Sequence, residues 1–161
     1  MTDLADLDNS DSGGIVSKTC SIEYREGNET PRYFETELGT INSMGLPNLG
    51  HKVYVDKIGS FSKPYIVSVA ANYLYNSFEI LDYITDNKSN TRVMVEINVS
   101  CPNIEGHQQL ADDFNRLNSF LFLLSMYLKK KPNNLFCNRP TLCCNYLIHS
   151  WQKVTAQTIY I

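Results

Sequence analysis

Three short segments of the sequence carry polar side chains that suit a flat, polar ligand. They are Ser17-Lys18-Thr19, residues 42–50 and residues 98–106. Lysine supplies a cation for a carboxylate or for an electron-rich ring edge, and each asparagine carboxamide in these segments supplies a donor and an acceptor. Gly45 would let the loop backbone approach a ring closely. A ring that contains imide groups has the complementary edge.

Cys101 is the candidate catalytic residue. It follows an expected strand in the segment Ser100-Cys101-Pro102-Asn103, where a thiol could act as a base or as a nucleophile. The alternative is structural, because most free cysteines are small buried hydrophobic residues. Lys18 alone suits a solvated strand end, and the glycines and asparagines of residues 42–50 suit turns alone. These residues indicate a site only as a set.

Alternating strands and helices are expected to position the three segments. Apolar or β-branched runs predict strands over residues 15–19, 64–70 and 92–99. Helical spacing predicts helices over residues 77–86 and 108–128. This order, with continuous apolar runs, indicates parallel strands covered by helices. Sites form at the carboxyl ends of such strands, so we expect the three segments to converge.

The remaining segments are expected to be less regular. Residues 3–9 suit the end of an acidic helix, and residues 23–39 suit an extended excursion or hairpin. Two glycines, a proline and two asparagines predict an irregular loop over residues 41–50. No element is assigned to residues 132–161, so we divide the chain into a domain over residues 1–131 and an unassigned tail.

Composition and charge limit the possible partners. The 161 residues are 43% hydrophobic and 19% charged, which is typical of one globular domain. The net charge of -3 and the pI near 5.6 argue against a nucleic-acid partner. The most apolar stretch, residues 120–128, is far shorter than the roughly 20 residues of a membrane-spanning helix. The acidic N-terminus has no targeting pattern, so a cytoplasmic location is expected.

Five cysteines lie at positions 20, 101, 137, 143 and 144, without the paired spacing of a disulfide framework. Free thiols in a reducing compartment are therefore expected. The alternative of a metal site on Cys137, Cys143, Cys144 and His149 lacks the paired spacing of a zinc module. We predict no metal.

Two longer motifs resemble a known family. Ile41-Asn-Ser-Met-Gly-Leu-Pro-Asn-Leu-Gly50, followed by Glu96-Ile-Asn-Val-Ser-Cys-Pro-Asn103, resembles the paired signature of cytosolic, fumarate-using dihydroorotate dehydrogenases. Lys18 in Ser-Lys-Thr, Tyr24-Arg-Glu-Gly-Asn28 and Gln109-Leu-Ala-Asp-Asp-Phe114 follow in the same family order. The resemblance covers about residues 3–118.

The resemblance implies an oxidoreductase of de novo pyrimidine (UMP) biosynthesis. Such an enzyme uses flavin mononucleotide (FMN) to oxidise dihydroorotate to orotate, and fumarate then reoxidises the flavin. The family fold is an eight-stranded α/β (TIM) barrel, usually in a homodimer. A barrel takes about 250 residues, so this chain is expected to hold roughly strands two to four with their helices. The alternative is an inactive remnant or an interaction module of the same family.

The resemblance also implies a role for each residue of the set. Cys101 would remove the proton from carbon 5 of dihydroorotate, while carbon 6 passes hydride to the flavin. Lys18 and Asn98 would contact both substrate and flavin, Thr19 would contact the flavin, and Asn103 would hold the pyrimidine. The remaining substrate-binding residues would be Asn42, Ser43, Met44, Gly45 and Leu46.

Overall fold

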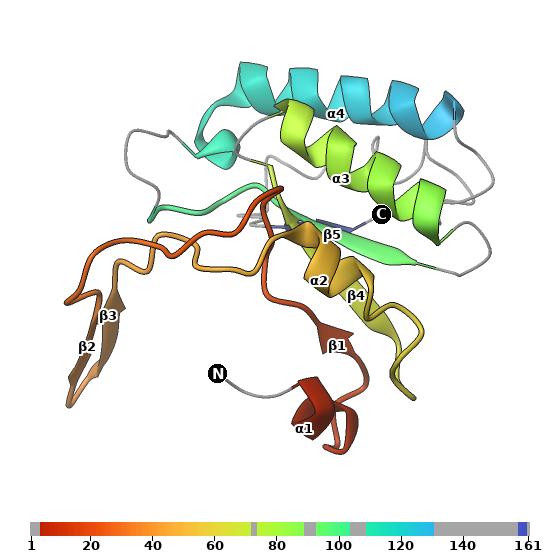
Figure 1. Cartoon of the computed structure of the whole chain (residues 1–161). Helices are drawn as coiled ribbons and strands as arrows, with labels where there is room; N and C mark the ends of the chain where they lie inside the picture. The colour runs from red at the N-terminus through yellow and green to blue at the C-terminus, as the bar shows by residue number, and fades with distance from the viewer. Residues whose placement is uncertain (1–3, 72–73, 89–92, 104–108, 131–157, 161) are drawn as a thin grey trace.

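A computed structural model describes residues 4–71, 74–88, 93–103, 109–130 and 158–160 of the chain. These residues form a mixed α/β fold in which helices cover one side of a sheet. A separate two-stranded hairpin projects away from the sheet and its helices (Figure 1). No helix in the described ranges is long and apolar enough to cross a membrane.

The sheet has a parallel core, as the sequence predicted. Strand β4 (Tyr65–Ala70) pairs in parallel with β1 (Ile15–Val16) on one side and with β5 (Met94–Asn98) on the other. Strand β6 (Thr158–Tyr160) adds to the free edge of β5 in the antiparallel direction. The sequence predicts no element in residues 132–161, so β6 is an addition to the predicted fold.

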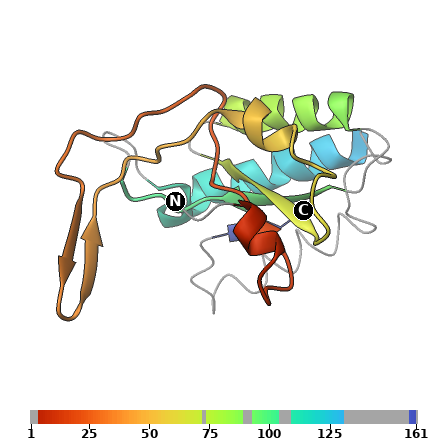
Figure 2. The same cartoon turned by 60° about the horizontal axis from the view of Figure 1, so that its bottom comes forward.

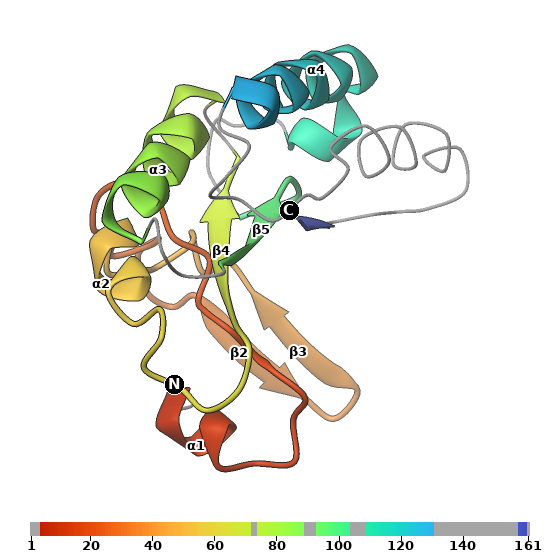
Figure 3. The same cartoon turned by 90° about the vertical axis from the view of Figure 1, so that its right-hand side faces the viewer.

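Two long helices cover one face of this sheet (Figure 3). Helix α3 (Leu74–Asn87) includes its whole predicted range. Helix α4 (Phe114–Lys130) begins later than the predicted residue 108, because the short 3-10 helix η1 (Leu110–Asp112) ends at Asp113, whose backbone is extended. Helix α4 begins after Asp113, whose carboxylate accepts a hydrogen bond from the backbone N–H of Arg116 at 3.0 Å. Its buried residues recur at helical spacing, and they are Leu117, Phe120, Leu121, Leu124 and Leu128.

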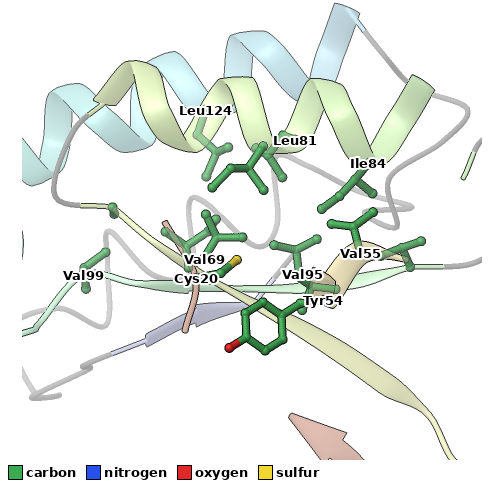
Figure 4. Close-up of a cluster of buried hydrophobic side chains, with 14 of the residues drawn as sticks. Cys20, Tyr54, Val55, Val69, Leu81, Ile84, Val95, Val99 and Leu124 are labelled. Atoms are coloured by element: carbon green, nitrogen blue, oxygen red, sulfur yellow. The ribbon is translucent and has the colours of Figure 1, made fainter. Parts of the chain in front are cut away.

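Alternate residues of β4 and β5 form the core beneath these helices (Figure 4). Val69 and Val95 are fully buried against Leu81 of α3 and Leu124 of α4. Burial of each such side chain stabilises the fold by about 1.5–3 kcal/mol. The intervening residues of the two strands point to the opposite face of the sheet. The strands thus present one face to the helices, and the opposite face carries polar residues, Ser68, Glu96 and Asn98, among apolar ones.

Other elements also differ from the sequence-based expectation. Strand β1 ends at Val16, whereas a strand was expected over residues 15–19. Helix α2 (His51–Val55) was not predicted, and strand β3 (Gly39–Asn42) includes the first two residues of the loop predicted over residues 41–50. The prediction of irregular structure was wrong for those two residues because Ile41 pairs with Phe34 across the hairpin. The hairpin's other strand, β2 (Tyr33–Thr36), lies within the excursion that was expected over residues 23–39.

The hairpin of β2 and β3 extends away from the sheet and its helices (Figures 1 and 2). Every residue of both strands is exposed. The exposed residues include large hydrophobic side chains, namely Tyr33, Phe34 and Ile41 in the strands and Leu38 at the turn. The hairpin contributes nothing to the main core, but it delivers Asn42 to the loop that follows.

Asp8, at the end of helix α1 (Leu4–Asp8), ties this helix to the segment that enters β4. Its carboxylate accepts hydrogen bonds from the backbone N–H groups of Ser62 and Lys63, both at 3.1 Å, and from the Ser62 hydroxyl at 2.9 Å. The backbone hydrogen bond from Ser62 is the largest influence that lowers the pKa of Asp8 below its ordinary value of 3.8. The charged carboxylate therefore favours the folded state.

We expect Asp8→Asn to lower the thermal midpoint (Tm) at pH 7 but not at about pH 2. The pKa of Asp8 is lower in the folded chain than in the unfolded chain. Its contribution is therefore present above the unfolded pKa and is lost as the pH falls through the folded pKa. Thermal unfolding followed by circular dichroism at both pH values tests this. Asp11→Asn, at an exposed position after α1, is the control. An equal deficit at both pH values would contradict the prediction.

Candidate functional site

The three predicted segments lie together at the carboxyl ends of β1, β4 and β5, the third as far as residue 103. Residues 104–106 of that segment lie outside the described residues. Residues 17–19 follow β1, and residues 99–103 follow β5. Backbone hydrogen bonds hold both against the end of β4, because Ala70 N–H donates to Cys20 O at 2.9 Å and Ala71 N–H donates to Asn98 O at 3.0 Å. The expected convergence at this edge of the sheet is thus present in the fold.

Thr19 and Asn98, two predicted flavin contacts, are joined directly. Asn98 Nδ2 donates to Thr19 Oγ1 at 3.3 Å, and Asn98 Oδ1 accepts from the backbone N–H of Ser100 at 3.0 Å. Ser17 is buried with its hydroxyl toward β4, where it accepts from the Ser68 N–H at 2.9 Å. Lys18, which lies between Ser17 and Thr19 in the sequence, is exposed. Its ammonium group is accessible to a ligand at this edge.

The loop over residues 42–46 has an unusual backbone that neighbouring residues support. Gly45 and Leu46 both have positive φ angles, of 71° and 58°, and the left-handed conformation is unfavourable for leucine by roughly 1–2 kcal/mol. Asn28 supports the loop by donating from Nδ2 to Ser43 O at 2.9 Å and from its backbone N–H to Met44 O at 3.1 Å. Backbone strain of this kind concentrates at binding sites.

Cys101 lies against this loop. Its side chain is half-buried and packs on Leu46 and on Ala70 at the end of β4. Two residues later, Asn103 Nδ2 donates to Asn42 Oδ1 at 2.8 Å. The Cys101 side chain therefore lies between the loop over residues 42–46 and the end of β4.

The other free cysteine of the described chain, Cys20, has a different environment. It is fully buried, and burial raises the pKa of its thiol to about 12. Cys20 is therefore a core residue. The metal-site alternative on the tail cysteines and His149 lies outside the described residues. Within the described ranges, no group of three or more His, Cys, Asp or Glu residues is arranged to hold a metal ion.

Sequence reasoning missed three supporting residues. Asn28 bridges the site by donating to both Ser43 O and Asn103 O. Ser68 lies next to Thr19, and Glu96 lies next to Ser68, on the face of the sheet opposite the helices. A serine and a glutamate inside otherwise apolar strands were the available signal, because a polar residue in such a run needs a partner when it is buried.

The fold and the site together define a class of protein: an α/β protein with a parallel sheet and a ligand site at the carboxyl ends of its strands. The family model for dihydroorotate dehydrogenase matches residues 1–132, and the chain belongs to this family of oxidoreductases. The resemblance noted in the sequence is thereby confirmed.

Individual relatives agree with this assignment. Dihydroorotate dehydrogenase A (fumarate) of Lactococcus lactis subsp. lactis is 40% identical over 125 residues, which are 74% of this chain and 40% of the relative. Its counterpart in Lactococcus lactis subsp. cremoris is 39% identical over 127 residues, 75% of this chain and 40% of the relative. Dihydroorotate dehydrogenase (fumarate) of Lachancea kluyveri is 38% identical over 134 residues, 80% of this chain and 42% of the relative. The chain spans about two fifths of the length of these curated relatives.

Proposed function

We propose that this chain forms the proton-abstracting part of a dihydroorotate dehydrogenase site. The reaction is oxidation of dihydroorotate to orotate, with FMN as the cofactor and fumarate as the electron acceptor, in cytoplasmic pyrimidine (UMP) biosynthesis. The observation that carries the proposal is the position of Cys101, which packs against Leu46 of the loop over residues 42–46 at the carboxyl end of β4.

The donor set at the strand ends fits a flavin ring. FMN, when bound, accepts the hydride that leaves the substrate. Its ring edge carries hydrogen-bond acceptors and becomes electron-rich on reduction, which suits the cation of Lys18 and the second Nδ2–H of Asn98. Asn98 contacts Thr19 at 3.3 Å, and Lys18 directly precedes Thr19 in the sequence. We therefore place these three residues around the flavin ring.

Cys101 is the proposed base. Its thiolate takes the proton from carbon 5 of dihydroorotate, the electron pair of that C–H bond forms the new ring double bond, and the hydride leaves from carbon 6. Asn42 and Asn103, hydrogen-bonded to each other at 2.8 Å, exchange this bond for bonds to the pyrimidine. The backbone of residues 43–46 completes the substrate cradle.

The architecture proposed for this part follows from the family. Residues 1–131 form a partial TIM barrel that contains roughly barrel strands two to four. Residues 132–161 stay an unassigned tail, of which strand β6 pairs with β5. The parallel order β1-β4-β5, with α3 and α4 on one face, is compatible with such a barrel. A homodimer is the expected assembly. The exposed hydrophobic residues of the hairpin are available for a contact with a second copy.

An FMN titration tests the proposal directly. We expect the full chain to perturb the visible absorption spectrum of FMN, and anaerobic dihydroorotate to bleach the bound flavin. Lys18→Ala should weaken flavin binding, because it removes the cation beside the ring. Lys52→Ala, which removes an exposed lysine of α2, should not. A chain that leaves the FMN spectrum unchanged would contradict the proposed activity and would favour the alternative of an inactive family member.

A further inference from the structure

Four polar side chains form a continuous hydrogen-bonded row on the sheet face opposite the helices. Ser68 Oγ donates to Glu96 Oε1 at 2.6 Å. Ser68 Oγ also lies 2.9 Å from Thr19 Oγ1, and Asn98 Nδ2 donates to that Thr19 oxygen at 3.3 Å. Ser68 pairs directly with Glu96 in the register of β4 and β5, so the sheet itself holds the start of the row in place.

The carboxylate of Glu96 gives this row a direction. A carboxylate only accepts hydrogen bonds, so the single hydroxyl proton of Ser68 is committed to Glu96. The contact between Ser68 and Thr19 therefore requires Thr19 to donate. With its own proton committed, Thr19 Oγ1 presents only a lone pair to Asn98. The Glu96 carboxylate thus determines which group donates and which accepts in every hydrogen bond of the row.

The row fixes which way the Asn98 carboxamide faces. Its Nδ2 must face the lone pair of Thr19, and its Oδ1 accepts from the backbone N–H of Ser100 at 3.0 Å. A flipped amide would place oxygen against oxygen at Thr19 and NH₂ against N–H at Ser100, with the loss of both hydrogen bonds. The second Nδ2–H has no partner among the described residues, so Asn98 offers a donor to a ligand.

We propose that Glu96 is a positioning residue that orients Asn98 through Ser68 and Thr19. The second Nδ2–H of Asn98 can then donate to a hydrogen-bond acceptor on a ligand. The identification of this ligand as a flavin or a pyrimidine rests on the proposed function. Ser68, in the middle of the row, is fully buried and shielded from competing water, while Thr19, Glu96 and Asn98 are half-buried.

Nuclear magnetic resonance on the ligand-free full chain tests the orientation itself. The side-chain NH₂ signals of Asn98 are assigned as those that Asn98→Asp removes. In the wild type, one of the two protons should exchange slowly with water. Glu96→Gln frees Ser68 to reverse its hydrogen bond, and we expect exchange of that proton to rise by about fivefold, as for the loss of one hydrogen bond of ordinary strength.

A matched control separates this effect from a general change in the strand. Met94→Gln introduces the same side chain on the same face of β5, two residues earlier and outside the row, and should leave the Asn98 signals unchanged. Thr19→Ser keeps the relaying hydroxyl and should retain slow exchange, whereas Thr19→Val should lose it. Equal exchange in Glu96→Gln and Met94→Gln, or in Thr19→Ser and Thr19→Val, would overturn the proposal.

Two independent readouts, Asn98 exchange and flavin bleaching, keep this inference separate from the proposed function. The exchange measurement uses no ligand, so its result holds whether or not the chain binds FMN. Altered exchange in Glu96→Gln without flavin binding would support the positioning role and contradict the enzyme activity. Flavin bleaching by dihydroorotate, with unaltered Asn98 exchange in Glu96→Gln, would do the reverse.

Discussion

Replacing Cys101 with alanine should slow the reduction of bound flavin by dihydroorotate by about 10²–10⁴-fold, the usual contribution of a positioned general base. The physical reason is that hydride departure from carbon 6 requires the proton on carbon 5 to be taken up, and the Cys101 side chain packs on Leu46 of the loop that we propose to bind the substrate. Flavin binding should be unchanged, since the residues proposed to hold the ring are Lys18, Thr19 and Asn98. Anaerobic stopped-flow absorbance measures both the binding and the bleaching.

Cys20→Ala is the matched control, because it removes the other free cysteine of the described chain. Cys20 is fully buried, and burial raises the pKa of its thiol to about 12, so the thiol stays protonated at the pH of the assay. We expect this variant to lose some stability through the small cavity but to keep the bleaching rate. If Cys101→Ala and Cys20→Ala bleached at the same rate as the wild type, Cys101 would not be the base.

The elements that the sequence predicted well are those with a strong apolar pattern. The strands β4 and β5 and the helices α3 and α4 each have enough buried side chains for the periodicity to identify them. Helix α2 lacked this signal, since its five residues depend on distant partners. His51 Nδ1 lies 2.8 Å from Ile22 O, and the His51 ring packs edge-on against Tyr83 at 4.8 Å. Contacts of this kind cannot be read from local sequence.

The site was predictable in a similar, partial way. The segments at residues 17–19, 42–50 and 98–106 stand out because polar and glycine residues follow apolar runs, and the family resemblance joined them. The connections among them did not stand out. Asn28 reaches Asn103 across 75 positions of sequence, and Ser68 reaches Glu96 through the register of the sheet. Such pairings follow from topology, which a single sequence specifies only indirectly.

Gly45→Ala should lower the free energy of unfolding by roughly 2–5 kcal/mol, through backbone strain and steric overlap together. Gly45 has a φ of 71°, which is unfavourable for alanine. A Cβ atom there would also lie 2.3 Å from Asn28 Oδ1 and 2.5 Å from the Asn28 backbone nitrogen. Urea unfolding followed by circular dichroism measures the loss.

Gly59→Ala separates the two causes, because Gly59 has a similar φ of 85° but no heavy atom within 4 Å of an added Cβ. It should lose only the backbone part, about 1–2 kcal/mol. Equal losses of unfolding free energy in Gly45→Ala and Gly59→Ala would show that steric overlap with Asn28 adds nothing to the cost at position 45. The double variant Asn28→Ala, Gly45→Ala should recover only part of the difference, because the Asn28 backbone nitrogen stays in place. The close approach of two backbones thus explains why glycine is needed at position 45, beside the residue that holds both Ser43 and Asn103.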